Sequence, residues 1–242
     1  MSGILFIVST PIGNLRDVTL RALSVLKNVD LILCEDTRIT KKLLDHYQIK
    51  TRTISYHQHS KIQKIDYIIN LLKRGKNLAL VSDAGTPGIS DPGNKLIQGV
   101  IELLSEQAEI VPIPGPSAVT VAVSISGFPM DKFLFLGFPP TKKKRKKFFE
   151  EIVNSKYPVI FYESPYRIIK TLGDLQLAIS PEQIPSELYG VNNKQLTINI
   201  VVCRELTKKF ETIYRGTIKE VIKEIEKGPI KGEFVVVIGG KK

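Results

Sequence analysis

The stretch ILFIVSTPIG (4–13) places a short apolar run directly before a turn that contains Pro11 and Gly13. A continuous apolar run of this length is typical of a strand that is buried on both faces of a parallel sheet. The stretch NLALVSD (77–83) repeats the arrangement, because its apolar run also ends at a loop rich in glycine and proline. The two stretches therefore predict buried parallel strands whose carboxyl ends carry tight loops.

Strands and helices alternate through the rest of the first half of the chain. The hydrophobic periodicity predicts further strands at 31–36 and 109–114, and helices at 17–27, 40–47, 62–75 and 92–104. Asp17 is the expected N-cap of the first helix. Alternation of this kind predicts a mostly parallel sheet with helices on both faces.

The segment PGPSA (114–118) interrupts this alternation, because its two prolines cannot continue a strand and Ser117 can cap a following helix. We expect a boundary near Gly115 between an N-terminal α/β domain (1–115) and a C-terminal α/β domain (116–242). In the second half we expect strands at 133–138, 158–164, 197–206, 211–216 and 233–240, with helices after the lysine run at 142–147, at 165–178 and at 217–227. The third and fourth of these strands are too close in sequence for a crossover helix. They should therefore be antiparallel and the second sheet mixed.

The composition is that of an ordinary globular protein, with 242 residues, 43% of them hydrophobic and 24% charged. No apolar run is long enough to span a bilayer, and no basic segment precedes the first strand. From this we expect no membrane anchor, no signal peptide and a cytoplasmic location. Cys34 and Cys203 lie far apart and outside any C-x-x-C pattern, which argues against a disulfide framework and a thiolate zinc site.

The chain carries a formal net charge of +11, and most of this excess lies in residues 116–242. Six consecutive basic residues form its densest part: Lys142, Lys143, Lys144, Arg145, Lys146 and Lys147. Such a run predicts a polyanionic partner, a nucleic acid rather than a membrane, because no amphipathic anchor accompanies it. The alternative is that the run is only the solvated start of a helix.

Loops with unusual turn chemistry follow four of the expected strands. They are TPIGNLRD (10–17), CEDTR (34–38), SDAGTPGISDPG (82–93) and PGPSA (114–118). Ligands of open α/β sheets bind at the carboxyl edge of the strands, and glycine turns let the backbone approach a ligand closely. The sequence therefore predicts a ligand site at this edge.

Two motifs of the second half add carboxylates and arginines, YESPYR (162–167) and RELTKKFE (204–211). Glu163 and Arg167 of the first motif could equally form a structural i,i+4 ion pair.

Several common chemistries have no motif in this chain. It contains no Walker A loop, no G-x-G-x-x-G after the first strand, no H-E-x-x-H and no G-x-S-x-G. His57 and His59 could bind a metal as an H-x-H pair, but no third ligand clusters with them in the sequence. We therefore expect surface histidines and no metal site.

Seven motifs in order and spacing resemble those of the ribosomal RNA small-subunit methyltransferase I family, within the tetrapyrrole-methylase-like superfamily. They are STPIGNLRDVTLRAL, CEDTR, VSDAGTPGISDPG, IPGPSA, FYESPYR, RELTK and GEFVVVI. The resemblance covers nearly the whole chain and implies two α/β domains with a cofactor cleft between them, usually in a homodimer. Tyr166 departs from the histidine expected in the YESPHR form, and the segment 180–197 is longer and more irregular than is typical.

The resemblance implies transfer of a methyl group from S-adenosyl-L-methionine to the 2′ hydroxyl of a cytidine in the decoding region of small-subunit rRNA, either free or in an assembled subunit. The expected cofactor contacts are Pro11, Ile12, Gly13, Asp83, Ala84, Gly85, Ser117, Ala118 and Tyr162. A ribose hydroxyl is a poor nucleophile, so a general base or a cation near the alkoxide would help. The candidates for these roles are Glu35, Asp36, Arg38, Glu163 and Arg167. Among them we favour Asp36 or Glu163 as the base and Arg38 as an RNA clamp.

Two other functions stay open at this point. A porphyrinoid methylase of the same fold would not need the charge of +11 or the lysine run. A non-catalytic RNA- or ribosome-binding module would not need four glycine- and proline-rich loops at one sheet edge. Both alternatives therefore fit the chain less well than an rRNA methyltransferase does.

Overall fold

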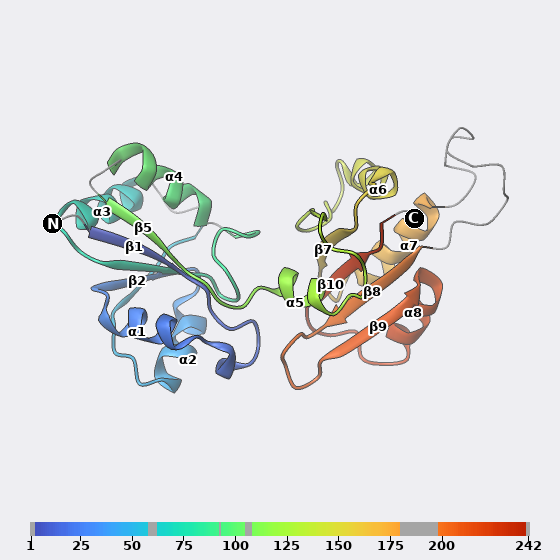
Figure 1. Ribbon diagram of the computed structural model, residues 1–242, viewed down its shortest axis with the longest axis horizontal. Helices are drawn as coiled ribbons and strands as arrows, with labels where there is room; N and C mark the ends of the chain where they lie inside the picture. Colours follow the sequence, from blue (N-terminus) through green and yellow to red (C-terminus); the bar gives the residue numbers. More distant parts are fainter. Residues whose placement is uncertain (1–2, 58–61, 92, 105–107, 180–197, 241–242) are drawn as a thin grey trace. The chain divides into compact units, whose positions relative to one another are not determined.

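The computed structural model describes residues 3–57, 62–91, 93–104, 108–179 and 198–240. These residues form two compact units, Met1–Ser117 and Ala118–Lys242. Each unit combines one sheet with helices (Figure 1), so the expected α/β class is confirmed. Among the described residues, no helix is long and apolar enough to cross a membrane.

The first unit contains a five-stranded sheet in the order β3-β2-β4-β1-β5, and every paired neighbour is parallel. Its strands are β1 (Gly3–Val8), β2 (Leu31–Cys34), β3 (Thr53–Ser55), β4 (Leu78–Val81) and β5 (Ala108–Ile113). Its helices are η1 (Leu15–Asp17), α1 (Leu20–Asn28), α2 (Thr37–His46), α3 (Ile62–Lys73) and α4 (Gly93–Leu104). In Figure 1, α1 and α2 cover one face of the sheet and α3 and α4 the other. Each face has its own apolar cluster, so the strands are buried on both sides as their sequences predict.

Local capping moves two helix starts away from the expected positions. Asp17 is not the N-cap of α1, because Asn14 caps the short helix η1, which uses residues 15–17. Thr19 caps α1 instead, and its side chain accepts a hydrogen bond from the Ala22 N–H. The next helix, α2, begins at Thr37 rather than Thr40, because Asp36 caps it. The short edge strand β3 was not predicted, since three residues carry too little periodicity.

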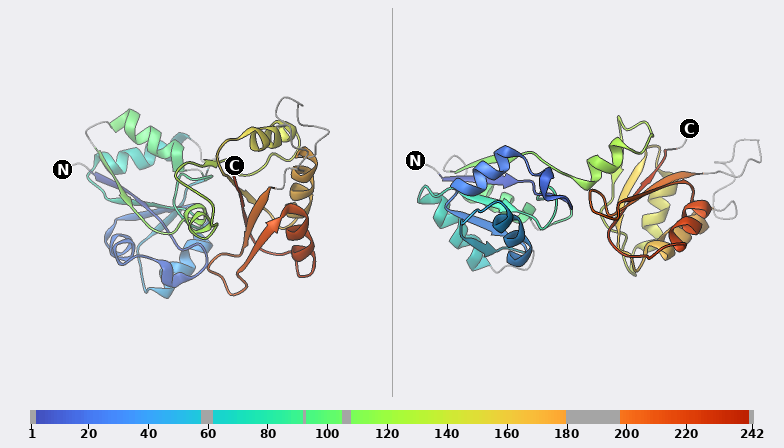
Figure 2. Two further views of the ribbon diagram at one scale, coloured as in Figure 1. Left: turned by 45° about the vertical axis from the view of Figure 1, so that its right-hand side comes forward. Right: turned by 90° about the horizontal axis from the view of Figure 1, so that it is seen from below.

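The second unit contains a mixed sheet in the order β6-β7-β10-β8-β9. Its elements are α5 (Ala118–Ser124), β6 (Leu134–Phe135), α6 (Arg145–Asn154), β7 (Val159–Glu163), α7 (Ile168–Ala178), β8 (Asn199–Arg204), β9 (Thr212–Thr217), α8 (Ile218–Glu226) and β10 (Phe234–Ile238). Strands β6 and β7 are parallel, whereas β8 and β9 form the expected antiparallel pair. Helices α6, α7 and α8 pack on one face of this sheet (Figure 2) over a single apolar cluster. The irregular segment 180–197 lies outside the described residues.

Candidate active site

Hydrogen bonds tie together the loops that follow β1, β4 and β5. The Ser9 hydroxyl lies 2.9 Å from the Thr86 hydroxyl, which donates to the Pro116 carbonyl at 3.1 Å. Thr10 and Gly85 exchange backbone hydrogen bonds of 2.9 and 3.1 Å. Three of the four loops expected at the carboxyl edge therefore contact one another directly.

The loop after β4 has a backbone that only glycine adopts readily. Gly85 has φ +85°, in the left-handed region, and its N–H and carbonyl are both bonded to Thr10. A second close approach occurs at Gly115, where an added Cβ would lie 2.9 Å from Ser9 Cβ. Glycine is thus favoured at Gly85 by its φ and at Gly115 by its contact with Ser9, at points where the loops meet.

The expected cofactor contacts fall into two groups. Those on the tied loops of the first unit are Pro11, Ile12, Gly13, Asp83, Ala84, Gly85 and Ser117. Ala118 begins α5 and Tyr162 lies in β7, so both belong to the second unit. Their contact with a cofactor stays a prediction, as does the position of the cofactor between the two domains.

A group of carboxylates joins the fourth loop to this edge. The Asp36 N–H donates to Asp83 Oδ1 at 2.9 Å, which links the loop after β2 to the loop after β4. Burial, and then the nearby carboxylates of Asp83, Asp91 and Asp36, raise the pKa of Glu35. Burial also raises the pKa of Asp83. Two acids of this edge are therefore more basic than ordinary surface carboxylates.

Asp36 has the opposite electrostatic environment. Its carboxylate accepts the Arg38 N–H at 2.8 Å as the cap of α2, and Arg38 Nη2 lies 2.6 Å from Asp36 Oδ2. These bonds to Arg38 lower the pKa of Asp36 to about 2. A carboxylate this acidic is a weak proton acceptor at neutral pH. Sequence reasoning listed Asp83 only as a cofactor contact and not among the candidate bases, although its position after a strand of the same sheet was a signal for an acid at this edge.

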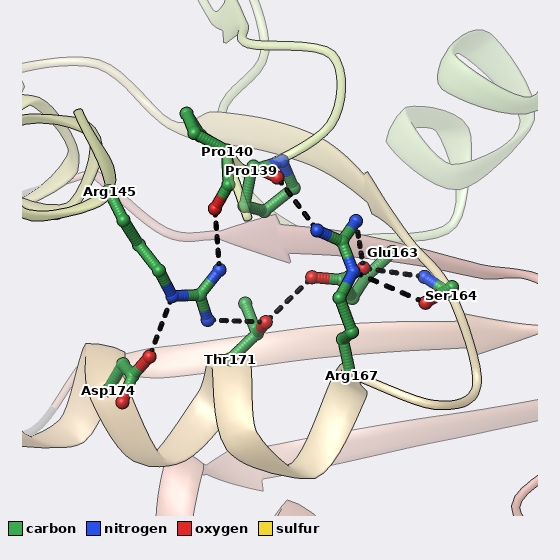
Figure 3. Close-up of polar contacts among 8 residues, drawn as sticks. All are labelled: Pro139, Pro140, Arg145, Glu163, Ser164, Arg167, Thr171 and Asp174. Carbon is green, nitrogen blue, oxygen red and sulfur yellow. Dashed lines mark hydrogen bonds and ion pairs between the residues drawn. The ribbon is translucent and has the colours of Figure 1, made fainter. Parts of the chain in front are cut away.

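In the second unit, a buried network forms where β7 ends (Figure 3). The Glu163 side chain is buried, and its Oε1 accepts the Ser164 N–H at 2.7 Å and Arg167 Nη2 at 2.7 Å. Its Oε2 accepts the Thr171 hydroxyl at 2.6 Å. The i,i+4 ion pair that the sequence allowed is therefore present, and both carboxylate oxygens already accept hydrogen bonds.

Arg145 differs from the five lysines around it. Its guanidinium donates to Asp174 Oδ2 at 2.8 Å, to the Thr171 hydroxyl at 2.9 Å and to the Pro140 carbonyl at 3.1 Å. Only 13% of its side chain is exposed, whereas Lys142, Lys143, Lys144, Lys146 and Lys147 are all exposed. Arg145 was expected to bind RNA together with the five lysines, and this contact stays a prediction, although its guanidinium already has three acceptors in the fold. A planar guanidinium can satisfy three acceptors at once, which an ammonium group does less well.

No group of three or more histidine, cysteine or acidic side chains within the described ranges is arranged to hold a metal ion. His57 is described, but His59, the other half of the expected pair, lies outside the described residues.

The parallel sheet with tied loops and the mixed second sheet form the tetrapyrrole-methylase fold. Residues 5–222 match the model of the Tetrapyrrole (Corrin/Porphyrin) Methylases family. The fold is also that of a solved cobalt precorrin-4 methyltransferase of cobalamin biosynthesis, with a TM-score of 0.67 and 16% identity over 98% of this chain and 94% of the other.

Two curated relatives narrow the class. The chain is 44% identical to the ribosomal RNA small subunit methyltransferase I of Halalkalibacterium halodurans, over 98% of this chain and 76% of the relative. It is 42% identical to the protein of the same name from Thermotoga maritima, over 99% of this chain and 100% of the relative. The chain belongs to the ribosomal RNA small subunit methyltransferase I family, which confirms the resemblance seen in its motifs.

Proposed function

We propose that this methyltransferase uses S-adenosyl-L-methionine to methylate the 2′ hydroxyl of a cytidine in the decoding region of small-subunit rRNA. Identity of more than 40% over nearly the whole chain to relatives named for the small-subunit rRNA carries this proposal. The solved porphyrinoid methyltransferase shares only the fold, at 16% identity. The exposed lysines of residues 142–147 support a polyanionic substrate over a small macrocycle.

The loops of the first unit fit such a cofactor. An adenosine and an amino-acid moiety can be held by backbone groups, and the loop after β4 offers a left-handed backbone at Gly85 that only glycine adopts readily. The residues that would hold the cofactor are Pro11, Ile12, Gly13, Asp83, Ala84, Gly85 and Ser117, with Ala118 and Tyr162 from the second unit. The cofactor supplies an electrophilic methyl group on a sulfonium, so the protein has mainly to orient the reactants and exclude water.

The carboxylates of the first unit offer a way to remove the ribose proton. A general base works best when its pKa lies near the working pH. The raised pKa values of Glu35 and Asp83 favour these two acids, whereas Asp36 is held near pKa 2 by Arg38. We therefore propose Glu35 or Asp83 as the base in place of Asp36 or Glu163. Arg38 lies on the same edge with 88% of its side chain exposed, where an RNA phosphate could reach it.

The exposed lysines are proposed to bind the RNA backbone. We expect that changing Lys142, Lys143, Lys144 and Lys146 to serine leaves the melting temperature nearly unchanged, because exposed charges contribute little to stability. The affinity for rRNA should fall, and the slope of log affinity against log salt should become shallower by at most ~4. A control variant, Lys219→Ser with Lys223→Ser on the exposed side of α8, should keep the wild-type slope. An unchanged slope in the first variant would place the RNA elsewhere.

Two further parts of the proposal concern the setting of the reaction. We propose a homodimer, as the family resemblance implies, and light scattering would measure its mass. A cytoplasmic location follows from the substrate, because small ribosomal subunits are found there. The same substrate could be met as free rRNA or as an assembled subunit, and both should be supplied in the assay.

The chemistry of the product tests the acceptor. A 2′-O-methylated nucleotide resists alkaline hydrolysis, because its 2′ oxygen can no longer attack the neighbouring phosphate. Incubation of the enzyme, labelled cofactor and purified small subunits should therefore yield, after alkaline digestion, label in a dinucleotide. Label in mononucleotides would contradict 2′-O transfer. Label only in an added porphyrinoid would indicate the porphyrinoid methylase, and RNA binding without any transfer would indicate a non-catalytic module.

A further inference from the structure

Phe138 is a large aromatic side chain that the fold leaves 53% exposed. It follows β6, whose parallel pairing with β7 continues to Gly137, where the carbonyl accepts the Tyr162 N–H at 2.8 Å. Phe138 therefore lies at the carboxyl edge of these two strands, the edge at which Glu163 also lies. Leu134 and Leu136, which precede Phe138, pack against the apolar core of the second unit, but Phe138 is not part of that core.

Two arginines fix the backbone directly after Phe138. Arg167 Nη1 donates to the Pro139 carbonyl at 3.0 Å, and Arg145 Nη1 donates to the Pro140 carbonyl at 3.1 Å (Figure 3). Each guanidinium is held in turn by a carboxylate, Arg167 by Glu163 and Arg145 by Asp174. The loop is thus anchored at two consecutive carbonyls by ion-paired side chains.

The ring itself is supported from one side. The Phe138 ring centroid lies 5.4 Å from that of Tyr162, and Tyr162 packs edge-on to Phe135 at 5.0 Å. A ring held in this way loses little conformational freedom when a second aromatic group packs on its exposed part. The loop therefore presents a preorganised aromatic surface to solvent.

We propose that Phe138 is a base-stacking residue for the RNA substrate, an inference that rests on the proposed function. Recognition of single-stranded RNA combines stacking of bases on aromatic rings with cationic groups that follow the phosphates. Lys142 comes only four residues after Phe138, so at most ~14 Å of extended chain separates the ring from the exposed lysines. A protein partner is a poorer match, because single exposed rings such as Phe138 and Tyr166 are far smaller than an apolar docking patch.

The test compares variants of Phe138 in their binding to small-subunit rRNA. Phe138→Ala should weaken binding by about 5- to 100-fold, and the KM for subunits should rise with kcat nearly unchanged. Phe138→Tyr should stay within about threefold of wild type, while Phe138→Leu, which is apolar but cannot stack, should be as weak as Phe138→Ala. S-adenosylmethionine affinity and melting temperature should not change in any of the three.

Tyr157 provides a matched control. It is 42% exposed, but it precedes β7 and so lies at the opposite edge of the sheet from Phe138. Tyr157→Ala should bind rRNA as wild type does. Wild-type affinity in Phe138→Leu or in Phe138→Ala would overturn the proposal, and so would a loss of cofactor affinity. The binding comparison needs no turnover, so failure of the wild-type enzyme to label subunits would count against the proposed function and not against stacking.

Discussion

The Gly85→Val enzyme is expected to bind S-adenosylmethionine at least about 100-fold more weakly than the wild type. Gly85 has φ +85°, a conformation that costs a β-branched residue about 1–3 kcal/mol. A Cβ at this position would lie 3.4 Å from Ile12 Cγ2 and 3.7 Å from the Pro116 carbonyl oxygen, so the two further methyl groups would have to point toward the ligand or displace these neighbours. Calorimetry in excess chelator measures the affinity and also checks the expectation that binding needs no metal.

A second glycine separates backbone strain from the loss of the binding surface. Gly127 has φ +75°, but no atom lies within 4 Å of a Cβ built there. Gly127→Val should therefore lower the melting temperature by an amount similar to Gly85→Val while keeping the wild-type cofactor affinity. If Gly85→Val also bound the cofactor normally, the tied loops of the first unit would not be the cofactor site.

Patterns confined to one segment were predictable from the sequence. The apolar runs before the loops at 10–17 and 82–93 indicated buried strands of a parallel sheet, and the structure confirms both as β1 and β4. The short spacing after β8 indicated its antiparallel pairing with β9. These predictions succeed because hydrophobic period and loop length are local properties that the fold must satisfy everywhere.

Properties that depend on the hydrogen bonds a side chain makes in the folded protein were not predictable. Arg145 stands among five lysines, and nothing in that run reveals that acceptors at Pro140, Thr171 and Asp174 converge on its guanidinium. The motif CEDTR did place Asp36 beside Arg38. Its low pKa follows only once Asp36 is known to be the cap of α2, because capping fixes the carboxylate toward the arginine. Candidate bases could thus be gathered from the sequence, but their ranking required the hydrogen bonds.

Glu163→Ala is expected to cause a large loss of stability, about 3 kcal/mol in the free energy of unfolding. Removing a partner of a buried ion pair costs about 3–5 kcal/mol, and the lower end applies here because Arg167 is partly exposed. The substitution also removes the acceptor of the Ser164 N–H and the Thr171 hydroxyl. Glu163→Gln keeps one acceptor oxygen and should cost roughly 1.5 kcal/mol. Denaturant unfolding of the full chain measures both values.

An exposed ion pair provides the control for this buried one. Glu150→Ala, which removes an exposed partner 3.8 Å from Lys146, should change the free energy of unfolding by no more than about 0.5 kcal/mol.

The same Glu163→Gln variant decides whether this carboxylate is also the catalytic base. Among the described residues, Ser164, Arg167 and Thr171 donate to its two oxygens, and these bonds position β7, α7 and the loop at Pro139. We therefore expect kcat in the labelled-subunit assay, below the melting temperature, to fall by less than about tenfold. A true base should lose roughly 10²-fold or more in kcat, as we expect for either Glu35→Gln or Asp83→Asn. Cofactor affinity should stay unchanged in Glu35→Gln, whereas Asp83 is also an expected cofactor contact. A loss of that size in Glu163→Gln, with wild-type rates in the Glu35 and Asp83 variants, would instead identify Glu163 as the base. Glu163 would then have to exchange one of its present hydrogen bonds for one with the ribose hydroxyl.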